Sequence, residues 1–428
     1  MNKTKKLMAL ALAGGLCFGS ASAAYAANGA LETDDPESPI EAKITKILTL
    51  PVGTDIPTET FTFVFTPEEV DGDSSSTAKS SMPTVTASVD ISASSDSDVD
   101  DGAIIVIQES DDFVDGINWP HAGVYVYTLT ESAALATSGM TYSGASYEVT
   151  FWVENCKDTD QCHPGLYVAG LGVKTITGDD GTGVTEEKVD PTPGGDDDTY
   201  FYSQVIFNNG YIEGGDGGDP KDPNKHMLSI SKAVDGAYAD QTMYFPFELK
   251  VTKPSTGVTG TPIYRAFVVE DQGSGLVVVT STANCASSIL KNDTTYGNYC
   301  EVTSGAMAAT AINIRHGQQI VFTDLHVGAT YEAVELYDSN YSAEGLLVVN
   351  GATAVGISPD MAGDDLTTGA QIIGAGENSA SITNTRLSAP PEGISLNDWP
   401  FIILIVLALA GGSAYVYTTV RRGKKSHA

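Results

Sequence analysis

The sequence predicts an all-β protein with two tandem β-sandwich domains. Three observations lead to this prediction. From Ala42 onward, short runs of alternating apolar and polar residues are separated by clusters of Gly, Pro, Asp and Ser, which is typical of a β-sandwich. No long amphipathic helical pattern is present. The order of strand types also returns in the second half of the chain, which suggests a duplicated domain.

The N-terminal segment, residues 1–26, is predicted to be a cleaved signal peptide. Lysines at its start precede a short apolar stretch, and Ala24-Tyr25-Ala26 offers a small-x-small cleavage site. The sequence therefore predicts an exported protein.

The first domain is expected over residues 40–213. Its expected strands are Ile44–Leu50, Thr60–Phe65, Ala103–Gln108, Val124–Thr130, Tyr147–Glu154, Tyr167–Val173 and Gln204–Ile212. Ser74–Ser81 and Ser92–Asp101 are predicted to be polar loops, and Gly178–Asp198 a mobile excursion rich in Gly, Asp and Pro.

A linker over residues 214–225, rich in glycine and without large apolar residues, is predicted to precede a second domain at 226–387. The strands expected there are Met227–Val234, Met243–Val251, Ile263–Glu270, Leu276–Thr280, Ala311–Arg315, Gln319–Phe322, Tyr331–Leu336 and Ala380–Thr385.

Each domain opens with a strand that carries a lysine on its apolar face. Alternation places Lys46 on one face with Ile44 and Leu48, and Lys232 on one face with its apolar neighbours. A bare ammonium group is costly to bury. Each lysine should therefore be neutral, paired or consumed by chemistry.

Matching partners occur on later strands of both domains. Alternation selects Glu131 on a middle strand and Asn209, rather than Asn208, on the last strand of the first domain. It selects Glu335 and Asn384 in the second domain, with a similar lysine-to-asparagine spacing of roughly 150 to 165 residues.

These three residue types can form an amide without a separate enzyme. Burial makes lysine a neutral nucleophile and keeps a glutamate protonated, so the glutamate can polarise the carboxamide and relay protons. The alternative interpretation is a set of ordinary buried polar residues, or errors in the strand register.

This pattern resembles the Gram-positive pilin isopeptide-linkage domain, as found in streptococcal major pilins. The motifs that carry the resemblance are the I-x-K strand openings, the Y-x-x-x-E segments, and the closing F-x-N-x-Y and I-x-N-T segments. The resemblance implies immunoglobulin-like sandwiches with adjacent first and last strands. It also implies a Lys46–Asn209 bond assisted by Glu131 and a Lys232–Asn384 bond assisted by Glu335, although Glu332 lies close to Glu335.

Four cysteines remain after signal cleavage, in two local pairs. In an exported chain, Cys156 with Cys162 and Cys285 with Cys300 indicate two disulfides. The rival interpretation, a metal site at Cys156, Cys162 and His163, lacks a second ligand pair.

The C-terminal end resembles a cell-wall sorting signal. Residues 388–400 form a predicted sorting motif or stalk, 401–420 an apolar transmembrane helix, and 421–428 a basic cytoplasmic tail. Ala389-Pro390-Pro391-Glu392-Gly393 stands where an L-P-x-T-G motif would stand, with alanine for leucine and glutamate for threonine. The alternative is a plain membrane anchor after a proline-rich stalk.

The chain carries 55 acidic residues against 22 basic ones, which argues against a nucleic-acid partner. No phosphate loop, Ser/His/Asp signature or H-E-x-x-H motif is present, so we expect no cofactor, no metal and no activity beyond self-directed bond formation. The expected function is a structural cell-surface protein, a pilin subunit or wall-anchored stalk. Its expected partners are a sortase transpeptidase, peptidoglycan and other pilin subunits.

A second function class remains open. The chain could be a non-polymerising surface adhesin that binds a host ligand or glycan. No V-Y-P-K motif marks an acceptor lysine for polymerisation, and Lys221 and Lys225 are the exposed candidates in the linker.

Overall fold

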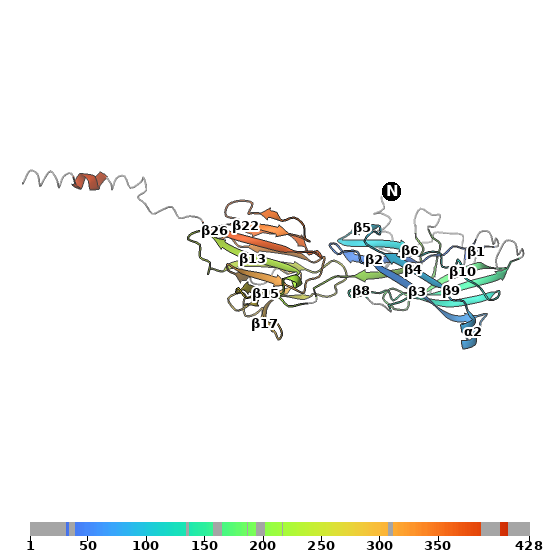
Figure 1. The fold of residues 1–428 in the computed structure, drawn as a ribbon. Helices are drawn as coiled ribbons and strands as arrows, with labels where there is room; N and C mark the ends of the chain where they lie inside the picture. The colour runs from blue at the N-terminus through green and yellow to red at the C-terminus, as the bar shows by residue number, and fades with distance from the viewer. Residues whose placement is uncertain are drawn as a thin grey trace, which may run out of the picture.

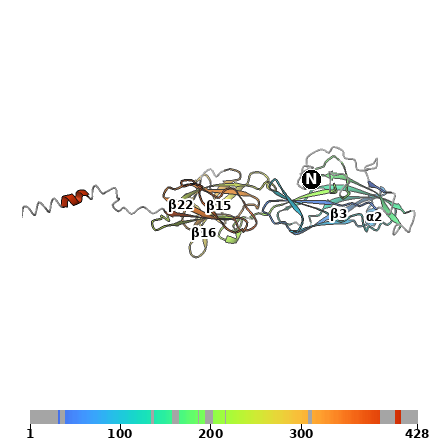
Figure 2. The same cartoon turned by 90° about the horizontal axis from the view of Figure 1, so that it is seen from above.

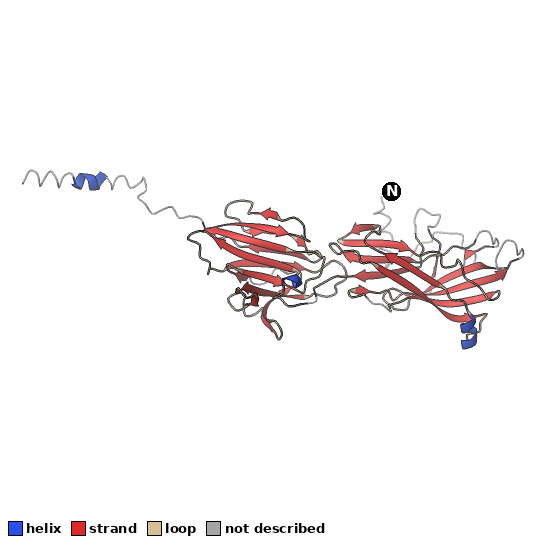
Figure 3. Ribbon diagram, viewed as in Figure 1, coloured by secondary structure: helices blue, strands red, loops and turns tan. Residues whose placement is uncertain are grey.

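The computed structural model describes residues 31–33, 39–133, 137–156, 165–185, 187–193, 202–215, 217–306, 311–386 and 403–409. Strands dominate these residues, and they form two successive β-rich bodies (Figures 1 and 3). The all-β prediction is confirmed. The named helical elements are α2 (Ser76–Ser81) and the 3-10 turn η2 (Pro223–Lys225).

The first body contains two sheets. One holds, in spatial order, β1 (Leu31–Glu32), β10 (Leu166–Thr177), β9 (Ser146–Asn155), β7 (Gly123–Glu131), β3 (Glu59–Val70) and β4 (Thr86–Ile91), with β11 (Lys188–Val189) on β10. The other holds β5 (Ser97–Asp100), β6 (Ala103–Glu109), β2 (Thr45–Pro51), β12 (Ile206–Tyr211) and β8 (Met140–Thr141).

The second body also contains two sheets. The larger holds β17 (Leu290–Asp293), β18 (Gly297–Thr303), β15 (Ile263–Asp271), β20 (Gln318–Phe322), β13 (Leu228–Asp235), β26 (Ser379–Arg386), β22 (Tyr341–Val348) and β23 (Val355–Ile357), with β16 (Leu276–Val278) on β15. The smaller holds β19 (Ile312–Ile314), β14 (Phe245–Thr252), β21 (Thr330–Glu335) and β24 (Leu366–Thr367), with β25 (Gln371–Ile372) on β21.

The core of the first body lies between its two sheets. Alternation along β3 buries Phe61 and Phe63, and they join Leu48 and Phe207 of the other sheet in one apolar cluster. The rings of Phe63 and Phe207 meet across the sheets with their centroids 4.9 Å apart. Full burial of each such side chain contributes about 1.5–3 kcal/mol. The second body has an equivalent core around Phe247.

In both bodies, the first long strand runs parallel to the last one. β12 lies beside β2, and β26 lies beside β13. Parallel neighbours cannot be joined by a tight hairpin, so most of each body is inserted between them in the sequence. This arrangement brings the N-terminal and C-terminal parts of each body side by side.

Two segments predicted to be loops form regular structure. Ser76–Ser81 is helical because Ser75 caps its start and accepts a hydrogen bond from Ala78 N. Part of Ser92–Asp101 forms the edge strand β5, which has no buried side chain and therefore lacks the apolar alternation that reveals a strand. The sequence pattern also did not predict the hairpin strands β17 and β18 or the long strand β22.

The start of the glycine-rich segment between the bodies pairs with the second body. Gly215 N donates to Leu325 O at 2.7 Å, Gly217 N donates to Thr323 O at 3.1 Å, and Val327 N donates to Glu213 O at 2.8 Å. Figure 2, which shows the molecule from above, shows the two bodies lying one after the other. Backbone pairing therefore holds this part of the segment against the second body.

The predicted signal peptide, the Ala389–Gly393 motif and the basic tail all lie outside the described residues. Of the predicted transmembrane stretch, residues 403–409 are described, and they are helical. Among the described residues, no helix has the length and apolar character needed to cross a bilayer.

Candidate functional site

Lys46 is completely buried in the first body. Its position on β2 faces the core, and its Nζ lies 4.6 Å from the centroid of the Phe61 ring. Nζ also forms an ion pair with Glu131, 2.7 Å from Oε1. Burial lowers the pKa of Lys46 to about 8, against the opposing effect of the Glu131 charge.

Glu131 connects the lysine to an asparagine. It ends β7, opposite Phe63 of β3, and its side chain is fully buried. The same oxygen that faces Lys46, Oε1, accepts a hydrogen bond from Asn209 Nδ2 at 3.0 Å. In the parallel β2–β12 register, Lys46 stands opposite Phe207, and Asn209 follows two residues later on the same face. One carboxylate oxygen thus contacts both nitrogen atoms.

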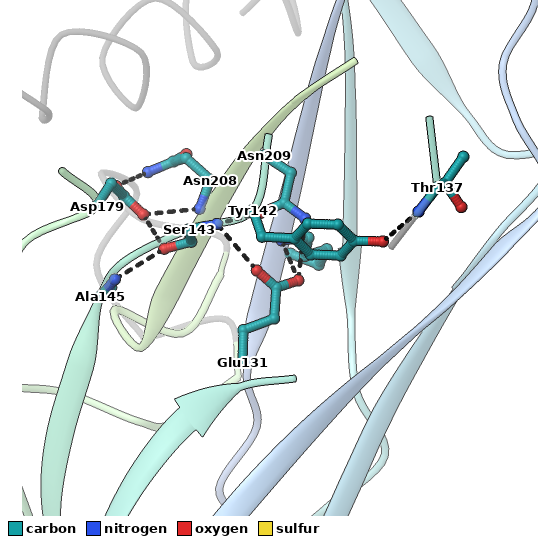
Figure 4. Close-up of polar contacts among 9 residues, drawn as sticks. Glu131, Thr137, Tyr142, Ser143, Ala145, Asp179, Asn208 and Asn209 are labelled. Atoms are coloured by element: carbon teal, nitrogen blue, oxygen red, sulfur yellow. Dashed lines mark hydrogen bonds and ion pairs between the residues drawn. The ribbon is translucent and has the colours of Figure 1, made fainter. Parts of the chain in front are cut away.

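A backbone N–H completes the first centre. Ser143 N donates to Asn209 Oδ1 at 2.8 Å and to Glu131 Oε2 at 3.1 Å (Figure 4). The segment that carries it follows β8 and leads into β9. Sequence reasoning missed Ser143, because a backbone donor leaves no residue-type signal.

Asp179 holds that segment against β12. Its carboxylate accepts hydrogen bonds from Ser143 Oγ, from Asn208 Nδ2 and, at 2.9 Å, from Asn208 N (Figure 4). Its own carbonyl accepts from Gly144 N at 2.7 Å. Asp179 lies in the excursion that the sequence analysis predicted to be mobile, whereas these contacts tie its start to the centre.

The second body contains an equivalent centre. Lys232 Nζ donates to both carboxylate oxygens of Glu335 at 2.8 Å, and Asn384 Nδ2 donates to Glu335 Oε1 at 2.6 Å. Lys232 stands opposite Ile382 in the parallel register, so Asn384 again follows two residues later. Nζ lies 4.6 Å from the Phe245 ring centroid. The two bodies therefore position the same groups by the same strand pairing.

Burial shifts the ionisation of both partners in the second centre. It lowers the pKa of Lys232 to about 8 and raises the pKa of Glu335 above its ordinary value, in each case against the attraction of the opposite charge. Glu332 does not belong to this centre, because alternation on β21 leaves it partly exposed while Glu335 is 2% exposed. The sequence-based preference for Glu335 thus agrees with its placement.

The two centres differ around the asparagine carbonyl. Asn384 Oδ1 is buried and has no hydrogen-bond partner among the described residues, whereas Asn209 Oδ1 accepts from Ser143 N. Glu335 and Asn384 also line a cavity of about 430 Å³.

The arrangement can support amide formation. A neutral lysine is a nucleophile, the carboxamide carbon is an electrophile, and a carboxyl group between the two nitrogens can move a proton from one to the other. Fixed placement replaces a bimolecular encounter and can account for much of the rate.

The described cysteines are not part of these centres. Cys285 and Cys300 form a disulfide that closes a loop with a sequence separation of 15, and both residues are buried. Cys156 is disulfide-bonded, whereas its predicted partner Cys162 lies outside the described residues. A disulfide at Cys156 is at odds with the rival metal-site interpretation.

The two bodies match different protein families. Residues 42–201 match the family described as "Spy0128-like isopeptide containing domain". The first body belongs to the pilin isopeptide-domain family. The matched range of this pilin-type domain includes Lys46 and Glu131 and ends before Asn209. Residues 226–386 match a different family, "Domain of unknown function (DUF7601)". No curated protein is significantly similar to the chain.

Among solved structures, the chain is similar to the major pilin of Streptococcus pyogenes, at 16% identity and a TM-score of 0.32, covering 82% of this chain and 100% of the pilin. A second similar structure is the T-13 major pilin of the same organism, at 15% identity and a TM-score of 0.29, covering 84% of this chain and 99% of that one. These scores are too low to indicate function.

Proposed function

We propose that the protein is a structural cell-surface pilin subunit or wall-anchored stalk whose two bodies are immunoglobulin-like domains, each closed by an intramolecular isopeptide bond. Lys46 joins Asn209 with the help of Glu131, and Lys232 joins Asn384 with the help of Glu335. The observation that carries the proposal is the shared carboxylate oxygen, which contacts the lysine and asparagine nitrogens in both domains.

The reaction is balanced within each centre. A proton passes from the lysine ammonium to the glutamate carboxylate, which leaves a neutral amine and a carboxylic acid. Nζ then attacks the asparagine Cγ, and the Cγ–Nδ2 bond breaks. Glu131 or Glu335 delivers its proton to Nδ2, which leaves as ammonia, and the carboxylate then takes the second proton from Nζ, so the glutamate ends protonated. The product is a neutral amide in place of a buried ion pair.

The intact mass of the recombinant ectodomain tests this proposal. The mass should be lower than the sequence mass by two ammonia molecules, beyond the hydrogens lost in disulfides. Lys46→Ala and Lys232→Ala should each abolish one ammonia loss. Lys43→Ala is the matched control, because Lys43 pairs with Glu41 near the surface, and it should leave both losses intact. Folded protein with the unmodified mass would refute the crosslinks.

Surface attachment forms a separate part of the proposal. A sortase would process the Ala389–Gly393 motif and join the chain to peptidoglycan or to another pilin subunit, as the order of motif, apolar stretch and basic end suggests. In cell-wall extracts, the protein should then remain covalently attached to peptidoglycan or to other subunits after boiling in SDS. An SDS-resistant ladder indicates polymerisation, and release of the whole protein by detergent alone would argue for a plain membrane anchor.

A further inference from the structure

We propose that Asp179 is a positioning residue for the first crosslink, and that it acts by holding the Ser143 N–H against the carbonyl oxygen of Asn209. This inference rests on the proposed isopeptide chemistry. It assigns a role to a carboxylate that contacts neither the nucleophile nor the carboxamide under attack.

The role begins with the orientation of the Asn209 side chain. Ser143 N donates to Oδ1, while Nδ2 donates to Glu131 (Figure 4). Because a carboxamide has one accepting and one donating end, these two bonds select one of its two orientations. In this orientation the leaving nitrogen faces the carboxyl group that must protonate it.

The same N–H acts on the transition state. When Lys46 Nζ attacks the Asn209 carbon, negative charge develops on Oδ1. A backbone N–H that already points at this oxygen stabilises the charge without further reorganisation. Ser143 N is thus a donor of the oxyanion-hole type, supplied by the segment between β8 and β9.

Asp179 is needed because β12 has no long second neighbour among the described residues. Within that part of the chain, β12 pairs beyond β2 only with the two residues of β8, at Gly210 and Tyr211. Asp179 instead accepts the Asn208 N–H, and the Tyr147 hydroxyl bonds to both Ile206 N and Ile206 O. In the second domain, β26 pairs with β22 along its whole length. Its backbone therefore does not need a side chain in the place of a neighbouring strand.

The Asp179 carboxylate joins both parts of the first centre at once. It bonds the side chain of Ser143 on one segment and the backbone of Asn208, the neighbour of Asn209, on the other. The approach is close at Gly144, where a Cβ atom would lie 2.6 Å from Gly181 N and 3.0 Å from Asp179 O. Loss of the carboxylate should let the Ser143 N–H move away from Oδ1.

The test follows both bonds in one polypeptide. The ectodomain is isolated unfolded in denaturant, refolded by dilution, quenched at intervals and digested. The two crosslinked peptides, which contain the Lys46–Asn209 and Lys232–Asn384 bonds, are then quantified separately by mass spectrometry. Asp179→Ala should slow the first bond at least about tenfold, because misplacement of a catalytic donor has effects of this size or larger. The second bond should form at the wild-type rate.

Two further variants separate positioning from a general loss of structure. Asp179→Asn keeps an oxygen acceptor for Asn208 N and should restore much of the rate. Asp180→Ala is the matched control, because Asp180 is on the same turn but accepts hydrogen bonds only from Thr182, and it should form both bonds at the wild-type rate. If Asp179→Ala fails to fold by near-UV circular dichroism, Ser143→Ala takes its place. It removes the side-chain link to Asp179, together with the hydrogen bond that Ser143 Oγ accepts from Ala145 N, and should slow the first bond about threefold.

The outcomes distinguish the two proposals. Wild-type rates for both bonds in the Asp179→Ala and Ser143→Ala variants, or equal slowing of both bonds, would overturn the role of Asp179. Absence of both bonds from the folded wild-type protein would instead overturn the proposed function itself.

Discussion

At the residue scale, the central feature is a carboxylate shared by an amine and a carboxamide. Each lysine is buried beside an aromatic ring and a glutamate, and burial brings the pKa of both Lys46 and Lys232 to about 8. Proton transfer to the glutamate therefore requires far less free energy than it would between exposed side chains. The lowered lysine pKa brings each ion pair closer in free energy to its neutral, reactive state.

The identity of the acid in the second domain can be tested directly. Glu335→Ala should reduce formation of the Lys232–Asn384 bond by about 10²-fold or more, because it removes the proton relay. Glu332→Ala should have no effect, since Glu332 lies on the other face of β21. The measurement is the yield of the crosslinked peptide after refolding. Equal yields from the two variants would exclude Glu335 as the acid.

The rate of the second bond should depend on pH in a bell-shaped manner. The neutral, reactive state and the ion pair of Lys232 and Glu335 hold the same number of titratable protons. Their ratio therefore does not depend on pH, and the rate should be constant between the two pKa values. Above the lysine pKa of about 8 the pair loses the proton needed for relay, so the rate falls. Below the raised pKa of Glu335 the lysine stays charged while the acid is protonated, and the rate falls again.

Refolding at a series of pH values, with quantification of the crosslinked peptide, measures this profile. A rate that continues to rise well above pH 8 would mean that neutral lysine alone is sufficient, and that no proton relay operates.

At the element scale, alternation along strands made part of the site predictable. A strand points every second side chain toward the core, and this alternation selects Lys46 over Lys43 and Asn209 over Asn208 from the sequence. The structure places the selected residues together. Ser143 and Asp179 could not be selected in this way, because their roles depend on contacts between distant segments and on a backbone group.

The same principle explains which elements were missed. β5 carries Ser, Asp and Val at an edge and buries none of them, so no apolar alternation marks it. α2 is a single short helix in a polar segment and is specified mainly by its N-cap at Ser75. Sequence patterns report burial, and elements that bury little remain hidden.

The disulfide provides a prediction for the β17–β18 hairpin. Replacement of Cys285 and Cys300 by alanine should lower the free energy of unfolding by about 3 kcal/mol, the chain-entropy value for a loop of about 15 residues. Urea unfolding monitored by hydrogen exchange at β15 and β18 measures this effect. The Lys232–Asn384 bond should still form, because the cysteines lie outside that centre. An unchanged midpoint would show that the bridge adds no stability.

At the scale of the whole molecule, the parallel pairing of first and last strands sets the path of mechanical force. β2 and β12 are neighbours in the first domain, and β13 and β26 in the second. With an isopeptide bond across each pair, tension applied at the chain ends passes through covalent bonds and bypasses the strands between them. This property suits a stalk or pilus shaft.

Single-molecule pulling tests this path. The wild-type ectodomain should show no unfolding step that releases the chain between the crosslinked residues. Lys46→Ala should add one step, with a gain in contour length of up to about 3.6 Å for each residue released between β2 and β12. Lys43→Ala should behave as the wild type. A full-length unfolding step in the wild type would contradict the proposed load path.

The adjacency of β2 and β12 has a further consequence for proteolysis. With Lys46 bonded to Asn209, the chain between them becomes a closed ring, with one free arm at each end. A single cut within the ring opens it without separating any fragment. A host or bacterial protease that nicks an exposed loop would therefore leave a protein that keeps its full mass, apart from one added water, and remains one molecule even after denaturation. A single nick within the ring would therefore not shorten the chain.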